Sequence, residues 1–278
     1  MKHSVVVTGA SGFVGGALAR ALRSAGIAVV PVARSPGAGW RQLADYREAP
    51  PADVLVHLAE DNNRGRVNAG GAAASGAAIR TMEQLLAKPY RRVIYASSAV
   101  LYGDEESQPR GRGDAVQLAD TYATTKWECE RRVLQAKGNL VVRLANIYGP
   151  AMSANNVIST ILGQIPGKGP LCVWDAGPVR DFLWIDDAVT ALCAAITSEV
   201  DGVLNLGSGV GHSIGEVARI ALAISGEADR PVQSTQPAGR SSRLVLDIQE
   251  TTRALGWRPT THLKTGVERL MNGRLSSE

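Results

Sequence analysis

Cysteine is scarce in this sequence, and its distribution excludes two kinds of structural support. The three cysteines, Cys129, Cys172 and Cys193, stand far apart and form no CxxC pair. An odd number of isolated cysteines indicates neither a disulfide framework nor a zinc site. We therefore expect no metal centre in this protein.

Long apolar runs are missing as well. The longest lies near residues 188–196, far short of the roughly 20 apolar residues that cross a bilayer. Residues 1–4 are followed by only three valines before glycines begin, so we expect no secretory signal. The sequence predicts a cytoplasmic protein without a membrane partner.

Aromatic residues make up only 5% of the chain, and its charge is only mildly basic. The formal net charge is +4, from 30 basic and 26 acidic residues, and the arginines are scattered rather than gathered in a block. A nucleic-acid surface combines clustered basic residues with aromatic rings on which bases stack, so we expect no nucleic-acid partner. The basic excess fits an anionic small molecule and fits a solvated surface equally well.

What the sequence does contain is a regular alternation of strand-like and helix-like segments. With 278 residues, 45% of them hydrophobic, the chain can form one large α/β domain or a large domain carrying a smaller one. The strands are apolar on both faces, which predicts a doubly wound parallel sheet of the Rossmann type. The predicted strands are 4–8, 28–33, 54–58, 92–96 and 140–144, and the predicted helices are 15–25, 72–87 and 122–136.

The stretch VVVTGASGFVGGAL near the start of the chain carries a chemical signal. Three valines form a buried strand, glycines at 9, 12 and 15 form a turn, and apolar residues then resume with helical spacing. In such a turn one glycine allows the tight bend, another lets the backbone approach a pyrophosphate, and a third lets helix and strand touch. The helix N-terminus adds free N–H groups and the positive end of its dipole. The segment predicts a dinucleotide-binding turn, although purely steric glycines would give the same spacing.

The alternation loosens after this first region, and residues 163–178 are rich in glycine and proline. We therefore predict a dinucleotide-binding Rossmann domain over residues 1–150 and a smaller, mostly substrate-binding C-terminal region over residues 151–278. A late segment near residues 180–206, with a strand near residues 203–206, is expected to return to the first domain.

The end of the second predicted strand bears on the choice of dinucleotide. A carboxylate at this place accepts from the ribose hydroxyls and repels a 2′-phosphate, whereas an arginine favours the phosphate. Here the strand ends in Arg34. The sequence therefore allows NAD or NADP and favours NADP, unless Arg34 is a surface residue that contacts no ligand.

Tyr122 and Lys126 stand four residues apart on a predicted helix and so lie on one face of it. An ammonium beside a phenol favours the phenolate, which lets the tyrosine exchange a proton with a substrate hydroxyl. Ser97 and Ser98 end a predicted strand, where parallel sheets bind ligands. Each residue has a structural explanation of its own, but their occurrence together in this order predicts a catalytic set. His57, at the end of its strand, is expected to be buried rather than catalytic.

These motifs together resemble a known family, the extended short-chain dehydrogenase/reductases. The resemblance rests on segments that occur in the family's order: TGASGFVG (8–15), VLVHLA (54–59), SSAVLYG (97–103), YATTK (122–126), RLANIYGP (143–150), RDFLWIDD (180–187), NLGSG (205–209) and LGWRP (255–259). Within that group the chain resembles the NAD-dependent epimerase/dehydratase family, and among its members the nucleotide-sugar 4-epimerases. The resemblance spans nearly the whole chain.

The resemblance implies roles residue by residue. Ser98, Tyr122 and Lys126 match the catalytic serine, the tyrosine acid/base and the ribose-binding lysine. The residues implied to bind the cofactor are Gly9, Ser11, Gly12, Phe13, Val14, Gly15, Arg34, Asp45, Leu58, Ala59, Tyr122 and Lys126. Those implied to bind a nucleoside-diphosphate sugar are Ser98, Asn146, Asn156, Arg180 and Arg240. The resemblance also implies a homodimer formed through the Tyr122 helix and its neighbour.

Departures from the family pattern narrow the reaction. The family's dehydratases carry an Asp-Glu pair after the catalytic residue, and this chain has Ala99 and Val100 there. Two reactions remain that need only the serine, tyrosine, lysine and a nicotinamide: epimerisation at C4 through a transient 4-keto sugar, and reduction of a 4-keto sugar by NADPH. The motifs favour the epimerase, whereas Arg34 favours the reductase. A non-catalytic dinucleotide-binding relative is the third hypothesis, which the presence of both Tyr122 and Lys126 argues against.

Overall fold

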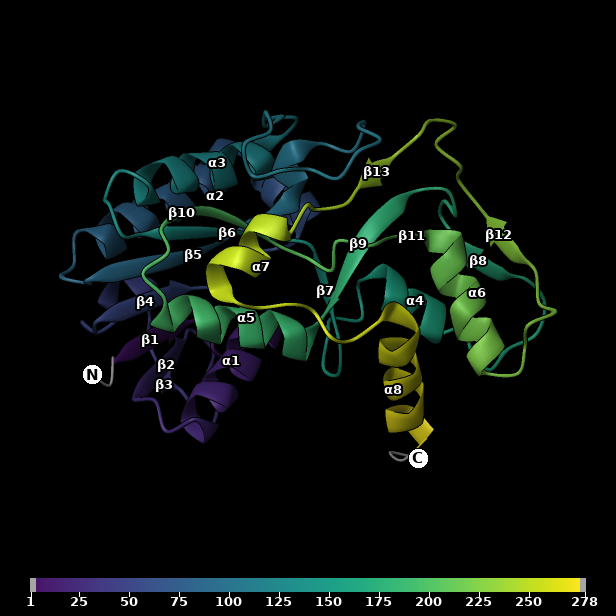
Figure 1. Ribbon diagram of the computed structural model, residues 1–278, viewed down its shortest axis with the longest axis horizontal. Coiled ribbons are helices and arrows are strands. Elements are labelled where there is room, and N and C mark those ends of the chain that lie inside the picture. Colours follow the sequence, from purple (N-terminus) through teal and green to yellow (C-terminus); the bar gives the residue numbers. More distant parts are fainter. Residues whose placement is uncertain (1–3, 276–278) are drawn as a thin grey trace.

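The computed structural model describes residues 4–275 and contains a seven-stranded parallel sheet (Figure 1). The strand order is β10-β6-β5-β4-β1-β2-β3. The doubly wound parallel sheet predicted from the sequence is confirmed, and each predicted strand is present with its ends shifted by at most about two residues. The strands are β1 Val5–Thr8, β2 Val29–Ala33, β3 Arg41–Gln42, β4 Val54–His57, β5 Arg92–Ser98, β6 Leu140–Leu144 and β10 Gly202–Leu206.

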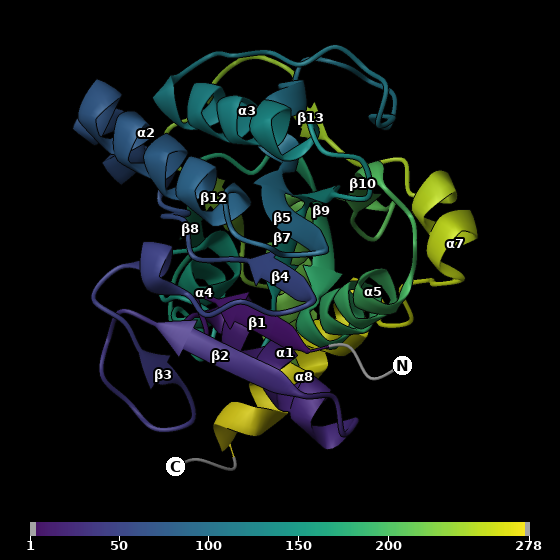
Figure 2. The same ribbon diagram turned by 90° about the vertical axis from the view of Figure 1, so that its left-hand side faces the viewer.

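Helices cover both faces of this sheet (Figure 2). On one side lie α1 Phe13–Ser24 and α5 Ile185–Thr197, and on the other lie α2 Arg64–Leu86 and α3 Thr121–Val133. Successive side chains of β1 enter different cores: Val5 and Val7 pack with Leu18 of α1, whereas Val6 packs with Leu85 of α2. A strand with helices on both faces buries every side chain, which explains its unbroken apolar sequence.

The helices differ from the prediction chiefly at α2, which begins at Arg64 rather than near residue 72. Asn63 caps it, since its side chain accepts a hydrogen bond from the N–H of Arg66. The helix is kinked at Gly71, whose φ of 52° is a conformation that favours glycine. Within residues 4–275, none of the helices combines the length and the apolarity that crossing a bilayer requires.

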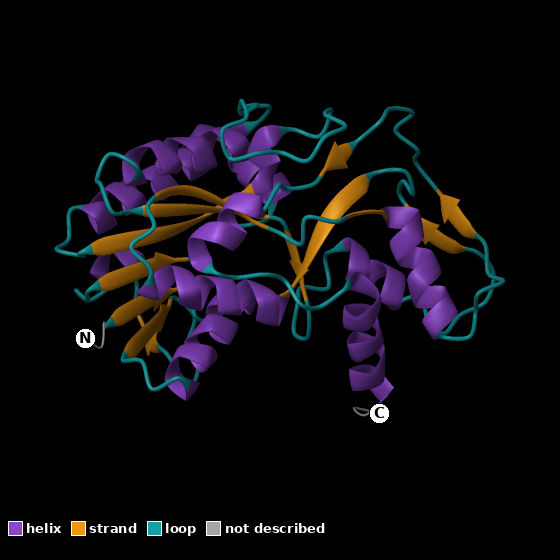
Figure 3. Ribbon diagram, viewed as in Figure 1, coloured by secondary structure: helices purple, strands orange, loops and turns teal. Residues whose placement is uncertain are grey.

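After β6 the chain builds a smaller second part beside the sheet (Figure 3). Its central strand is β9, which pairs with β7, β11 and β13, while β8 and β12 form a separate two-stranded sheet. These strands are β7 Asn146–Tyr148, β8 Leu171–Val173, β9 Val179–Trp184, β11 Gly211–Ser213, β12 Val232–Ser234 and β13 Arg243–Leu244. The remaining helices are α4 Val157–Leu162, α6 Ile214–Ile224, α7 Gln249–Leu255 and α8 Leu263–Leu275, with 3₁₀ turns η1 Tyr46–Glu48 and η2 Ala99–Tyr102.

The chain passes between the two parts more than once. After β9 it returns to cover the large sheet with α5 and to add β10 beside β6, before it leaves again for β11. Residues 185–206 therefore lie with the large sheet, although they follow the first strands of the second part. The division of the chain at residue 150 into two functional domains stays a prediction.

A single buried carboxylate ties the second part to the end of β10. Asp181 of β9 is 1% exposed, and it accepts hydrogen bonds from the N–H and hydroxyl of Ser208, at 2.7 and 2.6 Å, and from the N–H groups of Gly209 and Leu246. A Cβ atom at Gly207 would lie 2.4 Å from the Asp181 carboxylate, so only glycine fits there. This contact explains the small residues of the NLGSG motif.

We expect Asp181→Asn to lower the free energy of unfolding by about 2–4 kcal/mol, because the amide group cannot accept from all of these donors. The measurement is urea unfolding at neutral pH, with the exposed Asp229→Asn as the control of equal charge change. Equal midpoints for the two variants would contradict the role given to Asp181.

Candidate active site

The glycine turn after β1 is a place of close backbone contact. Gly9 has φ +73°, and a Cβ atom there would lie 2.7 Å from the carbonyl oxygen of Leu58, at the end of β4. A Cβ atom at Gly15 would lie 2.2 Å from the carbonyl oxygen of Gly9. Helix α1 can therefore rest directly on the turn only because these positions have no side chains.

The N-terminus of α1 has the form of an anion site. Its cap residue is Gly12, and no side chain caps its first N–H groups, whereas Asp120 caps α3 by accepting from the N–H of Ala123. The predicted residues Phe13 and Val14 stand in this first turn. Uncapped N–H groups at the positive end of a helix dipole suit a phosphate, so this turn fits the pyrophosphate of a dinucleotide.

Arg34 and Asp45, which the prediction placed near the adenosine end of the cofactor, both lie beside Tyr46. The exposed Arg34 guanidinium stands 5.4 Å from the centre of the Tyr46 ring. Asp45 caps η1, accepts from the N–H of Arg47 at 2.8 Å and pairs with its side chain at 2.6 Å. The hydrogen bond from the Arg47 backbone, with the charges of Arg47 and Arg34, holds the pKa of Asp45 below its ordinary value.

His57 has a structural role at the end of β4. It is 2% exposed, and its Nδ1 atom lies 2.8 Å from the hydroxyl oxygen of Thr8, which also accepts from the N–H of Leu58. Burial lowers the pKa of His57 to about 4, so the ring is neutral at neutral pH. The burial expected from the sequence is therefore present.

Ser98 ends β5, and its neighbour Ser97 lies one residue deeper. Ser97 is 4% exposed, whereas Ser98 is partly exposed and its hydroxyl oxygen accepts from the N–H of Val100 at 3.2 Å. The Ser98 hydroxyl proton thus stays available for donation. The structure thereby favours Ser98 over Ser97 as the serine that reaches a ligand.

Tyr122 and Lys126 lie in the first two turns of α3, as predicted. Asn68 of α2 accepts from the N–H of Tyr122 at 2.9 Å. The Lys126 ammonium nitrogen lies 5.9 Å from the centre of the Tyr122 ring and donates to the carbonyl oxygen of Ala96 in β5 at 2.9 Å. Both side chains are nearly buried, and Tyr122 is 7% exposed. Lys126 therefore lies against β5, and Tyr122 stands one helical turn before it on α3.

Glu60 is a charged neighbour that sequence reasoning missed. Its carboxylate lies 2.8 Å from the Lys126 ammonium and accepts from the Tyr95 hydroxyl at 2.8 Å. Burial works to lower the pKa of Lys126, but the Glu60 charge raises it above its ordinary value. Burial likewise works to raise the pKa of Glu60, and Lys126 brings it below the ordinary value. The sequence signal that could have identified Glu60 is its position directly after VLVHLA, at the end of a predicted parallel strand where ligands bind.

The predicted substrate arginines meet in the second part. Arg180 of β9 and Arg240 both pair with Asp104, at 3.1 and 3.0 Å, and Ser242 also donates to this carboxylate. Burial works to raise the pKa of Asp104, but the hydrogen bonds from Ser242 and Arg240 and the two arginine charges hold it below its ordinary value.

The two amide residues predicted to bind substrate, Asn146 and Asn156, have partners other than Asp104 and its arginines. Asn156 caps α4, since its side chain accepts from the N–H of Ser159. Asn146 of β7 donates to the carbonyl oxygen of Asp181 at 3.1 Å. Both side chains therefore hold backbone groups, and no contact joins either of them to Asp104 or its arginines among the described hydrogen bonds.

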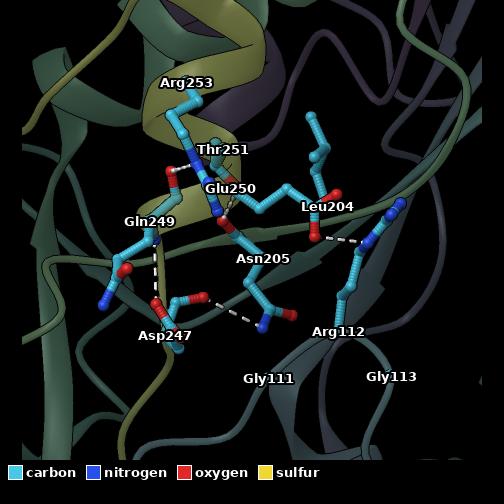
Figure 4. A pocket seen from close by; sticks show the side chains of 10 residues that line it. All are labelled: Gly111, Arg112, Gly113, Leu204, Asn205, Asp247, Gln249, Glu250, Thr251 and Arg253. Carbon is cyan, nitrogen blue, oxygen red and sulfur yellow. Dashed lines mark hydrogen bonds and ion pairs between the residues drawn. The ribbon is translucent and has the colours of Figure 1, made fainter.

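A cavity of about 310 Å³ lies away from these residues, between β10 and α7 (Figure 4). Asn205 at its floor donates to the carbonyl oxygens of Arg110 and Asp247 and accepts from the Tyr102 hydroxyl. Its polar groups bind one another, and none of its lining residues is a predicted site residue. In the described part of the chain, no three histidine, cysteine, aspartate or glutamate side chains gather as metal ligands would.

Comparison with known proteins identifies a family and a fold. The model of the NAD dependent epimerase/dehydratase family matches residues 5–207. A putative UDP-glucose 4-epimerase of Methanocaldococcus jannaschii is 24% identical over 204 residues, which cover 70% of this chain and 66% of that relative, just under two thirds of its length.

Solved structures share the fold over almost the whole chain. The UDP-glucose 4-epimerase of Thermotoga maritima, solved with UDP-glucose, superimposes with a TM-score of 0.86 at 20% identity, covering 99% of this chain and 100% of that one. MoeE5 in complex with UDP-glucose and NAD has a TM-score of 0.84 at 26% identity, with the same coverage.

We expect His57→Gln to reduce the loss of stability on acidification. The folded-state pKa of about 4 lies below the ordinary value of 6.5, so the unfolded chain binds more protons between these pH values and stability falls as the pH drops through them. Between pH 7 and pH 5 this ring alone should cost about 2 kcal/mol. Urea unfolding at both pH values measures it.

The matched control is the exposed His262→Gln, which should lose stability on acidification as the wild type does. If His57→Gln loses as much free energy as wild type between the two pH values, the pKa of His57 is not lowered in the folded protein.

Proposed function

Since the chain belongs to the NAD dependent epimerase/dehydratase family, we propose that it is an NAD(P)-dependent epimerase acting at C4 of a nucleoside-diphosphate sugar. The observation that carries this proposal is that Tyr122 and Lys126 share one face of α3 and that Lys126 binds the carbonyl oxygen of Ala96, two residues before Ser98 in β5. The reaction would pass through a transient 4-keto sugar.

The residues that would hold the dinucleotide follow one edge of the sheet. The N–H groups at the start of α1 suit its pyrophosphate, and Gly9 lets that phosphate approach the backbone. Arg34 and Asp45 would bind the adenosine end of the dinucleotide. Ser11, Gly12, Leu58 and Ala59 would contact it between the adenosine and the nicotinamide. Lys126 would bind the ribose beside the nicotinamide. The bound nicotinamide supplies the chemistry of accepting a hydride and returning it.

The chain's own groups handle the proton. Tyr122 would take the proton of the C4 hydroxyl and later give it back. The Lys126 ammonium nitrogen lies 5.9 Å from the centre of the Tyr122 ring. Ser98, whose hydroxyl proton is available, would donate to the same sugar oxygen. Ala99 is an apolar side chain with 4% exposure and offers no acid for a dehydration.

The diphosphate of the substrate would bind at Arg180 and Arg240. Two guanidinium groups that already converge on the Asp104 carboxylate offer the planar, paired donors that phosphate oxygens accept. Asn146 and Asn156 would complete this region. The UDP-glucose bound to two of the superimposed proteins is the first candidate substrate for this chain.

A second candidate function is reduction of a nucleotide-linked 4-keto sugar by NADPH. The observation that favours it is Arg34, exposed at the end of β2, where it could bind a 2′-phosphate. The two functions use the same serine, tyrosine and lysine and differ in whether the cofactor leaves after one hydride transfer.

We also propose that the protein is a homodimer whose interface includes α2 and α3. Their outer surface carries an ion-pair network, in which Arg132 binds both Glu83 and Glu128.

The dinucleotide that copurifies with the protein distinguishes the two functions. Tightly held NAD, recovered by denaturation and chromatography, is the expected result for an epimerase that recycles its cofactor. For the reductase we expect free exchange, preferential binding of NADPH, and about tenfold weaker NADPH binding in Arg34→Ala. The exposed Arg219→Ala is the control, and failure of the wild type to bind either dinucleotide contradicts both functions.

Tyr122→Phe tests the acid/base role. It keeps the ring and removes the proton-carrying group, so turnover should fall by about 10²–10⁴-fold while dinucleotide affinity changes little. The measurement is conversion of UDP-glucose to its C4 epimer. Tyr90→Phe is the control, because the Tyr90 hydroxyl donates to Pro50 on a distant loop, and undiminished turnover in Tyr122→Phe would rule out the role.

A further inference from the structure

Glu60 stands at the centre of a cluster that joins three elements of the sheet layer. It follows β4, and its carboxylate contacts Lys126 of α3 and Tyr95 of β5, each at 2.8 Å. The Lys126 and Glu60 side chains are only 8% and 11% exposed. The electrostatic interactions of this pair are strong, because little water is present to screen them.

The contacts described for Lys126 use two of the three N–H donors of its ammonium group. Its ammonium carries three donors, of which one binds Glu60 and one binds the Ala96 carbonyl oxygen. The nitrogen also lies 5.0 Å from the centre of the Tyr95 ring. Glu60 therefore restricts where the remaining donor points.

Three other titratable groups near this pair, His57, Tyr95 and Cys129, are neutral at neutral pH. His57 has a pKa of about 4, and burial raises the pKa values of the Tyr95 phenol and the Cys129 thiol well above their ordinary values. Among these groups, the Lys126 ammonium and the Glu60 carboxylate are the two that carry charge. Glu60 is accordingly the anion that balances Lys126.

We propose that Glu60 is a positioning residue for Lys126, and that by cancelling its charge Glu60 lets the site accept the oxidised form of the dinucleotide. This inference rests on the proposed function. The oxidised nicotinamide ring carries a positive charge that the reduced ring lacks. An uncompensated ammonium at the ribose would therefore penalise the oxidised form, and the Glu60 carboxylate removes that penalty.

The consequence concerns both proposed reactions. An epimerase must hold its cofactor in the oxidised state between turnovers, so a balanced charge at Lys126 supports that state. A reductase gains from the opposite bias, since it binds the reduced form and releases the oxidised one. Glu60 thus favours the epimerase, in contrast to Arg34.

Glu60→Gln separates charge from hydrogen bonding. The glutamine carbonyl oxygen can still accept from Lys126 and Tyr95, while the negative charge is lost. We expect the ratio of the dissociation constants of oxidised to reduced dinucleotide to rise by about tenfold, as one unit charge does in a partly buried site. Calorimetric titration of the cofactor-stripped protein with NAD⁺ and NADH, and with NADP⁺ and NADPH, measures this ratio without any turnover.

Two variants serve as controls. Glu199→Gln removes the same charge from an exposed ion pair with Arg91, in which the Glu199 side chain is 79% exposed, and should leave the ratio unchanged. Glu60→Asp keeps the charge on a shorter side chain and should keep the ratio near that of the wild type, even where both affinities fall.

The outcomes separate the two claims. If Glu60→Gln weakens both redox forms equally, or neither, Glu60 has only a structural role and the inference is overturned. A shift of the ratio in Glu60→Asp as large as in Glu60→Gln also overturns it, because the charge is then not the cause. If the wild type binds no dinucleotide at all, the proposed function fails first. If the glutamine variant does not fold, Glu60→Ala takes its place: a raised ratio supports the inference and an unchanged ratio overturns it.

Discussion

The close approach of α1 to the end of β1 is the contact on which the candidate site depends. Gly15 packs so close to the backbone of Gly9 that no side chain fits at residue 15. Gly9 packs equally close to Leu58, directly after β4. The first helix is therefore fixed with its uncapped N-terminus at the edge where the parallel strands end. Backbone groups alone give this edge the form of an anion site.

Buried charges fix helix α3, on the other face of the sheet, in a comparable manner. Tyr122, Lys126 and Glu130 follow one another at intervals of four residues and share a face of the helix. Lys126 pairs with Glu60 beyond β4, and Glu130 pairs with Arg143 of β6 at 2.7 Å, with both side chains at most 3% exposed. Buried pairs are costly to desolvate and add specificity of arrangement more than stability. Here they hold α3 at two successive turns, and Tyr122 stands in the turn before them.

The second part of the molecule contributes the positive charges of two arginines, whereas the large sheet contributes backbone N–H donors. Asp104 extends from the loop after η2 and holds Arg180 and Arg240 together in spite of their like charges. Asp181, the residue after Arg180, anchors β9 to the turn that follows β10. The orientation of Arg180, which we propose to bind the substrate diphosphate, thus depends on a buried carboxylate next to it, so the two parts of the fold are coupled through β9.

The sequence by itself determined the parallel sheet, the glycine turn and the Tyr122–Lys126 spacing, because each is a local pattern: runs of β-branched residues, glycines that must lack a side chain, and residues one helical turn apart. It could not reveal that Glu60 neutralises Lys126, since these residues are 66 positions apart in the chain and meet only when β4, β5 and α3 pack. The same holds for Asp104, whose sequence neighbours suggest a solvated loop and whose partners lie far along the chain. Asn156 shows the reverse, because its match to a ligand-binding position gave no sign that its side chain caps α4. Local patterns decided which residues the chain places at the edge of the sheet, and only tertiary packing decided which charges face one another there.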